Sequence, residues 1–421
     1  MNSKKYEIEK FGAFSEGVAR DDGKAIFIKG ALPGEVVFAK PTLIKKSFTK
    51  AKLVNVISPS KDRVPPQCAF FDVCGGCSLQ HLSYTAQLDY KVQLVKETLK
   101  KVGGIDAKVD KIIASDKIFR YRNKLSFPVR NKKIGLYEES SHSVVDIDDC
   151  LLQREWNKPL IKALRAFMTD HRLLGYDEQK GDIRHIVARE KDGSICITLV
   201  TAKRIKIDGF LRYIPFDNFA LYQNVNSKNN NVILSDEFYL VGGKGKYPDF
   251  HPASFYQVND YIEDRLYNDV LTECQGDTVI DAYCGAGNLT LQIASKATFV
   301  YGLEICKQAV DEANNKANKL RALNVQFICG DCKDEFPSIA AKAQGNVTVL
   351  FDPPRKGVDE NTLKATLDHA PQKIVYVSCN PATLARDLKP LTSAYTVQKV
   401  MAYDMFPMTS HVETIVCLCK Q

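Results

Sequence analysis

The sequence has no continuous apolar run long enough to cross a bilayer, and its N-terminus leads into charged residues. A membrane-spanning helix needs about 20 predominantly apolar residues, and a secretory signal needs an apolar segment followed by small residues. We therefore expect a cytoplasmic protein that has no membrane partner. The 13 cysteines, an odd number, are then expected to be reduced thiols, metal ligands or catalytic groups instead of disulfides.

Three familiar cofactor and redox motifs are also absent. No G-x-G-x-x-G fingerprint of a dinucleotide-binding unit follows a strand. The cysteine spacing is not the C-x3-C-x2-C that is usual for radical chemistry on S-adenosylmethionine. No strand–helix frame of the thioredoxin kind surrounds Cys74 and Cys77. These absences disfavour dehydrogenases, radical enzymes and thiol oxidoreductases.

Length and charge indicate several domains and a polyanionic partner. With 421 residues the chain exceeds one ordinary core, and 45% apolar with 26% charged residues is typical of a globular protein. Residues 1–60 carry 11 basic and 6 acidic side chains, residues 61–250 carry 31 and 24, and residues 251–421 carry 16 and 20. A nucleic acid bound by the first 250 residues would explain this distribution. The alternative is a solubilising surface.

Residues 1–60 are predicted to form a small β-barrel. Short alternating strands such as Asp22–Ile28 and Gly34–Ala39 are separated by glycine turns. Five such strands in little more than fifty residues suit a closed barrel of the oligonucleotide-binding type. The basic stretch Lys45–Lys52 would lie at its rim.

Residues 61–250 are expected to form an α+β domain that holds a metal or a cluster. Cys68, Cys74 and Cys77 are spaced C-x5-C-x2-C, with two glycines inside the tighter pair. Close cysteines on a glycine turn let several thiolates converge on one site. The fourth ligand would be Cys150, the next cysteine along the chain, or His81. Buried free thiols are the alternative.

From residue 251 to 421 strands alternate with helices. A glycine run before Pro248 indicates a domain junction near residue 250. A helix from about 257 to 273 leads in, and strands are expected near 278, 299, 325, 347, 374, 396 and 412. We expect a parallel sheet with helices on both faces, and the last two strands as an antiparallel pair at one edge.

Three carboxylates stand at the ends of successive predicted strands. Asp281 precedes the turn Gly285-x-Gly287, Glu304 ends the next strand, and Asp331 ends the third. Glycines after a strand allow a ligand to approach closely, and the two later acids could accept ribose hydroxyls and an adenine amino group. The ordered series favours S-adenosylmethionine, although each acid alone could be a helix cap.

Two further strand ends carry the candidate chemistry. Cys379 follows an apolar strand and is the candidate nucleophile, with a buried thiol as the alternative. Asp352-Pro-Pro-Arg355 ends the strand before it. Glu413 begins the last strand among apolar residues, where a carboxylate is costly unless it is used or paired. It is the candidate base, with His411 as a helper.

Taken together, these motifs closely resemble those of the RNA 5-methyluridine methyltransferases. The resemblance rests on C-x5-C-x2-C, Phe255–Asn259, Asp281–Asn288, Asp352–Gly357, Ser378–Pro381 and His411–Glu413, and it covers nearly the whole chain. It is strongest to the branch that acts on uridines of 23S ribosomal RNA. The first sixty residues look like the TRAM domain of that branch, and the cysteines look like its four-iron cluster.

The resemblance implies a fold, ligands and residue roles. It implies an α/β, Rossmann-like S-adenosylmethionine methyltransferase domain at 251–421, a TRAM barrel at 1–60 and a cluster domain at 61–250. S-adenosylmethionine would be held by Gln257, Tyr283, Asn288, Glu304, Asp331 and Asp352. A [4Fe–4S] cluster would be held by Cys68, Cys74, Cys77 and Cys150. Cys379 would be the nucleophile and Glu413 the base.

The expected reaction is methylation of carbon 5 of a uridine in 23S ribosomal RNA by a monomer. Thiolate addition at carbon 6 makes carbon 5 nucleophilic, and a base must then remove the carbon 5 proton. Alternatives are a methyltransferase acting on transfer RNA, a cluster-bearing RNA-binding module without catalysis, and an amino-group methyltransferase. The last would need no nucleophilic cysteine.

Overall fold

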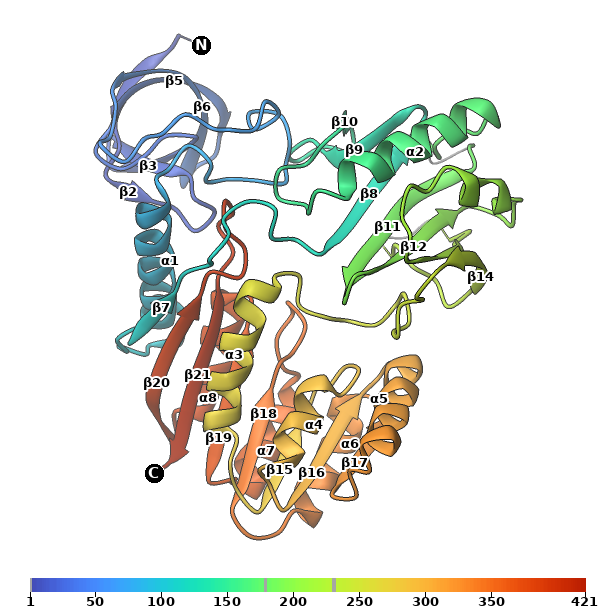
Figure 1. The fold of residues 1–421 in the computed structure, drawn as a ribbon. Coiled ribbons are helices and arrows are strands. Elements are labelled where there is room, and N and C mark those ends of the chain that lie inside the picture. Colours follow the sequence, from blue (N-terminus) through green and yellow to red (C-terminus); the bar gives the residue numbers. More distant parts are fainter. Residues whose placement is uncertain (1, 178–179, 229–231) are drawn as a thin grey trace.

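Three β-sheets of six, seven and eight strands organise the chain. The computed structural model describes residues 2–177, 180–228 and 232–421. Figure 1 shows the six-stranded and seven-stranded sheets side by side, with the eight-stranded sheet beneath both of them. Among the described residues, no helix combines the length and the apolar character needed to cross a membrane.

The first sheet curls into a barrel at the N-terminus (Figure 1). Its strands are β1 (Lys4–Glu7), β2 (Lys10–Phe11), β3 (Gly17–Asp21), β4 (Lys24–Lys29), β5 (Val36–Ile44) and β6 (Phe48–Ser58), in the order β1-β5-β6-β4-β3-β2. Alternating side chains such as Ile26 and Ile28 fill the interior, as the period of two predicts. The barrel has one strand more than expected. The additional strand is β2, which was not predicted because it has only two residues. Lys45 and Lys46 are exposed in the turn between β5 and β6.

A helix and one short strand connect the barrel to the eight-stranded sheet. The helix α1 (Tyr84–Thr98) continues into a π-helical turn η1 (Leu99–Gly103), and β7 (Lys111–Ile113) follows. Val95 and Leu99 lie in the apolar core beneath the eight-stranded sheet, and β7 pairs with the edge of that sheet. This segment therefore packs with residues beyond 250, while the division of the chain at 250 stays a prediction.

The seven-stranded sheet is mostly antiparallel and is covered by one helix. It contains β8 (Lys124–Arg130), β9 (Lys133–Tyr137), β10 (Val144–Asp146), β11 (Ile183–Lys191), β12 (Ser194–Thr201), β13 (Phe219–Val225) and β14 (Phe238–Lys244), in the order β10-β9-β8-β11-β12-β13-β14. The helix α2 (Asn157–Asp170) packs Leu160, Leu164 and Phe167 on it, and a 3-10 turn η2 (Asp208–Arg212) closes one end. This is the expected mixture of helix and strand.

The eight-stranded sheet alternates strands and helices. Along the chain come α3 (Asp260–Glu273), β15 (Thr278–Asp281), α4 (Asn288–Ala294), β16 (Phe299–Glu304), α5 (Lys307–Leu320), β17 (Val325–Cys329), α6 (Cys332–Lys342), β18 (Val347–Phe351), α7 (Glu360–His369), β19 (Lys373–Ser378), α8 (Pro381–Leu391), β20 (Tyr395–Tyr403) and β21 (Glu413–Lys420). Their order in the sheet is β17-β16-β15-β18-β19-β21-β20-β7, with β15 to β19 parallel. Each strand from β15 to β21 begins within one residue of its expected start.

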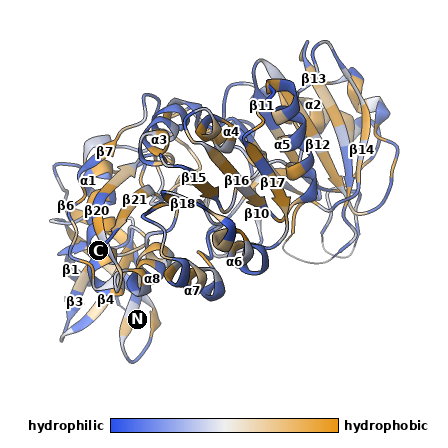
Figure 2. Ribbon diagram, turned by 90° about the horizontal axis from the view of Figure 1, so that it is seen from below, coloured by the Kyte–Doolittle hydropathy of each residue, from blue (hydrophilic) through white to orange (hydrophobic). Residues whose placement is uncertain are grey.

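One part of the expected topology is wrong. The last two strands do form an antiparallel pair, but β21 lies between β19 and β20, and β7 occupies the edge. The strand order reverses between β15 and β18, so that a crevice opens at the carboxyl ends of these strands. Apolar layers cover both faces, with α3 and α4 on one side and α1, α6, α7 and α8 on the other. Figure 2 shows the apolar strands between these helices.

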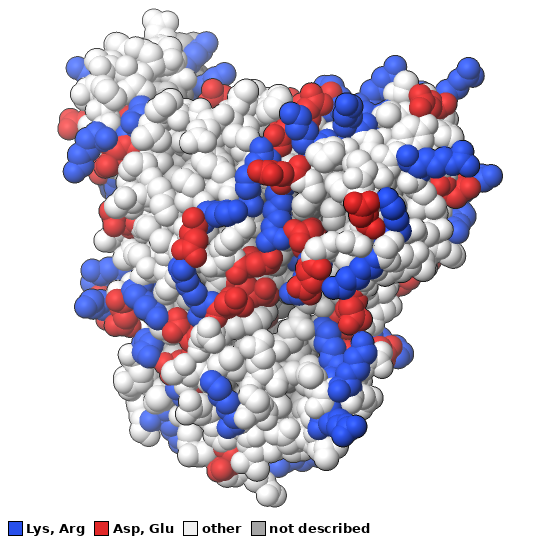
Figure 3. Space-filling view, viewed as in Figure 1, with Lys and Arg blue, Asp and Glu red and all other residues white. Residues whose placement is uncertain are grey.

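Charged side chains of both signs mix on the face shown in Figure 3. Lysine and arginine are interspersed there with acidic residues along the boundary between the upper sheets and the eight-stranded sheet. The basic excess of the first 250 residues is therefore not gathered into one continuous patch on this face.

Candidate active site

The strand ends of the eight-stranded sheet bring the expected site residues to one edge. Because β15 to β19 are parallel and in register, their carboxyl ends point the same way. Asp281 and Glu304 are the last residues of β15 and β16, while Asp331, Asp352 and Cys379 follow β17, β18 and β19. The grouping expected from the sequence is therefore present in the fold.

In the turn after β15, neighbouring side chains pack closely against the backbone of Gly287. Gly287 has φ of +74°, and a Cβ at this position would lie 2.7 Å from the ring of Phe327 and 2.8 Å from Ala313. Asp281 is buried beneath the turn and accepts a hydrogen bond from Thr290 Oγ1 at 2.7 Å. Burial raises the pKa of Asp281 to about 6. Asp281 therefore supports the turn from beneath, and the later residues of the turn lie at the crevice.

Glu304 ties the turn to the next strand. Its Oε2 accepts from the backbone N–H of Gly285 at 3.1 Å, and its Oε1 accepts from the N–H of Cys306 at 2.8 Å. A carboxylate has about four acceptor positions, so two backbone bonds leave positions open for hydroxyl donors. Glu304 therefore has a structural role and can hold a ribose as well.

Tyr283 and Asp331 line a common cavity of 580 Å³ against α6, α7 and α8. Asp331 also caps α6 by accepting from the N–H of Lys333 at 3.2 Å. Val358 and Leu363 supply apolar walls. An aromatic ring, apolar walls and a carboxylate acceptor together suit a purine that carries an amino group.

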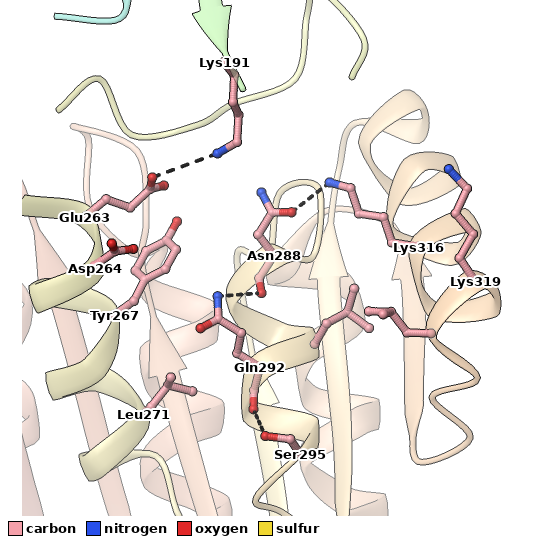
Figure 4. A pocket seen from close by; sticks show the side chains of 12 residues that line it. Lys191, Glu263, Asp264, Tyr267, Leu271, Asn288, Gln292, Ser295, Lys316 and Lys319 are labelled. Carbon is pink, nitrogen blue, oxygen red and sulfur yellow. Dashed lines mark hydrogen bonds and ion pairs between the residues drawn. The ribbon is translucent and has the colours of Figure 1, made fainter. Parts of the chain in front are cut away.

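A second cavity, of 710 Å³, lies between α3, α4 and α5 (Figure 4). Asn288, the first residue of α4, extends its side chain into it, and Lys191 of β11 reaches it from the seven-stranded sheet. Gln257 lies in the buried loop that leads to α3. The carbonyl of Gln257 accepts from Asn123 Nδ2 at 3.0 Å and from Arg189 Nη1 at 3.3 Å. Residues at and beside the seven-stranded sheet thus hold the backbone of Gln257 in place.

Cys379 and Glu413 stand beside each other on neighbouring strands. In the antiparallel register of β19 and β21, Ser378 is paired with Thr414, so the next residues outward are Cys379 and Glu413. Glu413 is only 3% exposed. Burial raises its pKa well above the ordinary range, the negative charge of Asp352 adds to this, and Arg355 opposes it. Burial and then Glu413 raise the pKa of Cys379 to about 11.

The turn that carries Arg355 is hydrogen-bonded to the residues that follow Cys379. The carbonyl of Arg355 accepts from Asn380 Nδ2 and from Thr383 Oγ1, both at 3.3 Å. Asp387 of α8 is buried, and its Oδ2 accepts from the N–H of Val358 at 2.8 Å. Asp387 was not expected from the sequence. An acid on the apolar face of a predicted helix was the only signal that could have identified it.

His411 is exposed, two residues before Glu413. Desolvation of the imidazole, followed by the positive charges of Arg355, Lys91 and Arg122, lowers the pKa of His411 to about 4. The imidazole is therefore neutral near pH 7 and can accept a proton.

Four cysteines line one cavity in the central domain. Cys68, Cys74, Cys77 and Cys150 surround it together with Phe70, Phe71 and Leu136. His81, the alternative fourth ligand, does not line this cavity; it lies against the ring of Phe71, and burial lowers its pKa to about 4. The geometry therefore favours Cys150 as the fourth member.

Four thiols around one cavity could hold either a single zinc ion or an iron–sulfur cluster. Within residues 2–177, 180–228 and 232–421, no three His, Cys, Asp or Glu side chains are placed to hold one metal ion. Sulfurs around one zinc ion would lie about 3.8 Å apart, given zinc–sulfur bonds of about 2.3 Å. Four cysteines around one shared cavity are also the donor set of a four-cysteine iron–sulfur cluster.

Comparisons with known proteins agree with this architecture. The family model "tRNA (Uracil-5-)-methyltransferase" matches residues 83–421, and the TRAM domain model matches residues 7–54. An RNA methyltransferase of Halalkalibacterium halodurans is 40% identical, with 98% of this chain and 95% of the relative covered. An RNA methyltransferase of Clostridium tetani is 38% identical over the same shares of the two chains.

A solved structure extends the similarity to three dimensions. The tRNA (uracil-54, C5)-methyltransferase of Pyrococcus abyssi, in complex with S-adenosyl-L-homocysteine, superimposes with a TM-score of 0.81. It is 27% identical, and the match covers 98% of this chain and 99% of that one. The resemblance found in the sequence motifs is thereby confirmed: the chain belongs to the tRNA (uracil-5-)-methyltransferase family and carries an N-terminal TRAM domain.

Proposed function

We propose that this protein uses S-adenosylmethionine to methylate carbon 5 of a uridine in RNA, with 23S ribosomal RNA as the substrate. The observation that carries the proposal is the cross-strand placement of Cys379 beside Glu413. Addition–elimination on uracil needs a nucleophile below carbon 6 and a base at carbon 5 of the same ring. An amino-group methyltransferase would need no nucleophilic cysteine.

Cys379 begins the reaction as a thiolate. Its sulfur forms a bond to carbon 6 of uracil, and the electron pair moves onto carbon 5 and oxygen 4. Carbon 5 then takes the methyl group, whose bond to the cofactor sulfur breaks and leaves S-adenosylhomocysteine. Glu413 removes the carbon 5 proton, the double bond re-forms, and the bond from carbon 6 to Cys379 breaks to release the thiolate. Starting from the thiolate of Cys379 and the carboxylate of Glu413, every bond and proton of the cycle is accounted for without an oxidant.

Protonation sets the starting state of this pair. In the ligand-free protein burial raises the pKa of both Cys379 and Glu413, and next in size are the charge of Glu413 acting on Cys379 and the charge of Asp352 acting on Glu413. A positive charge nearby favours the ionised forms. Arg355 supplies one such charge, and the sulfonium of a bound cofactor would supply a second beside Asp352.

The cofactor site is proposed along the crevice edge. Tyr283 and Asp331 would hold the adenine, Glu304 the ribose, and Gln257, Asn288 and Asp352 the methionine end. The cavity at Tyr283 and Asp331 and the open acceptor positions of Glu304 support this order. The Pyrococcus abyssi structure, which contains S-adenosyl-L-homocysteine, supports the choice of cofactor.

Cys68, Cys74, Cys77 and Cys150 are proposed to hold a [4Fe–4S] cluster. The cavity that the four cysteines share and the C-x5-C-x2-C spacing of the first three support this proposal. When bound, the cluster would join the loop after the barrel to the segment that follows β10. The loop that follows Cys77 is hydrogen-bonded to the segment before His411, through the N–H of Ser78 to the carbonyl of Met408 and the N–H of Ser410 to Ser78 Oγ, both at 3.0 Å. The proposed role of the cluster is therefore to hold this loop, and with it the central domain, against the catalytic domain.

Transfer RNA is the second candidate substrate. The observation that favours it is the similarity of nearly the whole chain to a tRNA enzyme. The preference for ribosomal RNA rests on the resemblance of the sequence motifs to that branch; the barrel does not separate the two candidates, because the match to the tRNA enzyme covers 98% of this chain. Whichever of the two RNAs is the substrate, we propose that the protein acts on it as a monomer.

One experiment tests the reaction and the substrate together. Purified protein is incubated with methyl-labelled S-adenosylmethionine and either 23S ribosomal RNA or transfer RNA that lacks 5-methyluridine. Label in 5-methyluridine of ribosomal RNA alone is the expected result. Label in transfer RNA alone would favour the second candidate. Label on an exocyclic amino group, or none, would overturn the proposed reaction.

A further inference from the structure

Lys316 of α5 sits at the centre of a hydrogen-bond network at the end of the 710 Å³ cavity. Its Nζ lies within 3.3 Å of four acceptors that come from three separate segments of the chain. They are Asn288 Oδ1 at 2.8 Å, the Ala286 carbonyl at 3.3 Å, the Tyr256 hydroxyl at 3.0 Å and Glu312 Oε1 at 2.6 Å. Figure 4 shows the contact between Lys316 and Asn288.

Glu312 completes the network from the same helix. Its carboxylate accepts from the Tyr256 hydroxyl and from Ser254 Oγ, both at 2.5 Å, and from the backbone N–H of His251 at 3.3 Å. The side chains of Lys316 and Glu312 are only 22% and 12% exposed. Tyr256 and Ser254 are buried. The pair therefore fastens the loop before α3 to α5.

The chemistry of lysine fixes the orientation of Asn288. An ammonium can only donate hydrogen bonds, so Asn288 must turn its amide oxygen toward Lys316. The Nδ2 group is then the part of the amide that remains to donate elsewhere. Without the lysine the amide could rotate and offer its oxygen instead.

We propose that Lys316 is a positioning residue for the cofactor. It orients Asn288 so that Nδ2 donates to the α-carboxylate of S-adenosylmethionine, and it holds Tyr256 so that the adjoining Gln257 stays in place. This inference rests on the proposed function, since Asn288 and Gln257 are cofactor residues only there. Lys316 does not contact the cofactor itself, because its donors are already taken by protein oxygens.

The first test separates positioning from catalysis. Lys316→Met should raise the KM for S-adenosylmethionine about ten- to a hundred-fold, because a hydrogen bond to a charged group is misplaced. The kcat at saturating cofactor and the KM for RNA should change little, as they do when only ground-state binding is lost. Calorimetric titration with S-adenosylhomocysteine should show the same loss of affinity. An unchanged affinity for both would overturn the inference.

Lys319 provides the matched control. It lies on the same helix and lines the same cavity (Figure 4), but its partner is the exposed Asp249 at 3.4 Å. Lys319→Met removes the same charge without touching Asn288, and it should keep the wild-type KM. An equal loss of cofactor affinity in both variants would mean that the charge of the cavity matters and the orientation of the Asn288 amide does not. That result would also overturn the inference.

A double-mutant cycle tests whether Lys316 acts through Asn288. In the Asn288→Ala background, Lys316→Met should cost much less affinity than it does in the wild type. Fully additive losses would contradict the inference. If Lys316→Met does not fold, as judged by its melting curve, Lys316→Gln takes its place in every arm, with an intermediate loss expected. Failure of the proposed function itself is distinguishable, because the wild-type protein would then bind no S-adenosylhomocysteine.

Discussion

Lys91 and Asp404 form an ion pair whose two side chains are both fully buried. Lys91 comes from the middle of α1, and Asp404 follows β20 directly. Lys91 Nζ also donates to the carbonyl of Phe406 at 3.1 Å. The pair therefore fastens the helix that leaves the barrel to the segment that leads to His411 and Glu413.

Removing one member of this pair should destabilise the fold strongly. Lys91→Met leaves the Asp404 carboxylate buried without its partner, which costs about 3–5 kcal/mol. The free energy of unfolding, measured by urea titration, should fall by that amount. Replacing both residues, as in Lys91→Met with Asp404→Leu, should recover most of the loss, because no uncompensated charge remains.

Lys111→Met is the control for this prediction. Lys111 pairs with Asp269 at 2.8 Å, but its side chain is 47% exposed. Exposed pairs contribute about 0–1 kcal/mol. If Lys91→Met costs no more than Lys111→Met, the buried pair does not hold the two segments together.

Several strands of the eight-stranded sheet were predictable because their apolar runs are bounded by glycine, asparagine or a charged residue. The runs from Thr278, Val325 and Val347 show this pattern. The position of β7 could not be predicted in the same way. Lys111–Ile113 has only three residues, and its partner in the sheet is Met401–Tyr403, almost three hundred positions away. Short strands that pair over such distances leave no periodic signal.

The site residues also divide into those that the sequence could predict and those that it could not. Glu304, Asp331 and Cys379 could be identified because each ends a strand, and strand ends share one edge. Lys316 and Asp387 could not, because their roles depend on contacts across the fold. A lysine on one face of an amphipathic helix looks like any solvated lysine until its partner Asn288 is known.

The cysteine cavity makes a prediction about iron. Protein purified without oxygen should be brown and contain about four irons per chain. Cys150→Ser should lose most of the iron and the visible absorbance, because it removes one of the four thiols that line the cavity. Cys196→Ser, a buried thiol of the same sheet away from the cavity, should keep both. Iron retained in full by Cys150→Ser, or zinc in place of iron after anaerobic reconstitution, would contradict the assignment.

The lysines at the rim of the barrel should contribute to RNA affinity through phosphates. Lys45, Lys46 and Lys50 are exposed at and beside the turn between β5 and β6. Changing all three to Gln should weaken RNA binding and reduce the slope of log affinity against log salt by up to about one for each lost phosphate contact. The affinity for S-adenosylhomocysteine should not change. Lys342→Gln on α6 serves as the control, and a wild-type salt slope in the triple variant would remove the barrel rim from the RNA interface.

The stability that Asp352 contributes to the ligand-free protein should fall as the pH rises from about 4 to about 7. Burial, and next the charge of Asp281, raise the pKa of Asp352 from 3.8 to about 7. The folded state then binds a proton that the unfolded chain has released, so stability is lost between those two values. Asp352→Asn should flatten this fall in a series of melting temperatures, whereas the exposed Asp368→Asn should not.

The cofactor should reverse that trend. A sulfonium cation stabilises ionised carboxylates beside it, so S-adenosylmethionine should raise the melting temperature more at about pH 7 than at about pH 5. An equal rise at both values would mean that the cation does not lie near Asp352.

The nucleophile and the base act at different steps, so their variants should fail differently. Cys379→Ala should abolish methylation and any covalent adduct, because carbon 5 is not activated without addition at carbon 6. Glu413→Gln should still add to uracil and transfer the methyl group, and should then stall with the carbon 5 proton in place. Loss of a positioned base costs roughly 10²–10⁴ in rate, so slow release of product is expected.

A denaturing gel with labelled RNA and S-adenosylmethionine distinguishes these outcomes. Glu413→Gln should accumulate a protein–RNA species on unmodified RNA, and Cys379→Ala should form none. Cys419→Ala, which removes a thiol near the far end of β21, should turn over like the wild type. If Glu413→Gln reacts at the wild-type rate without an adduct, the base is another group. The neutral His411, two residues away, would then be tested next by His411→Gln.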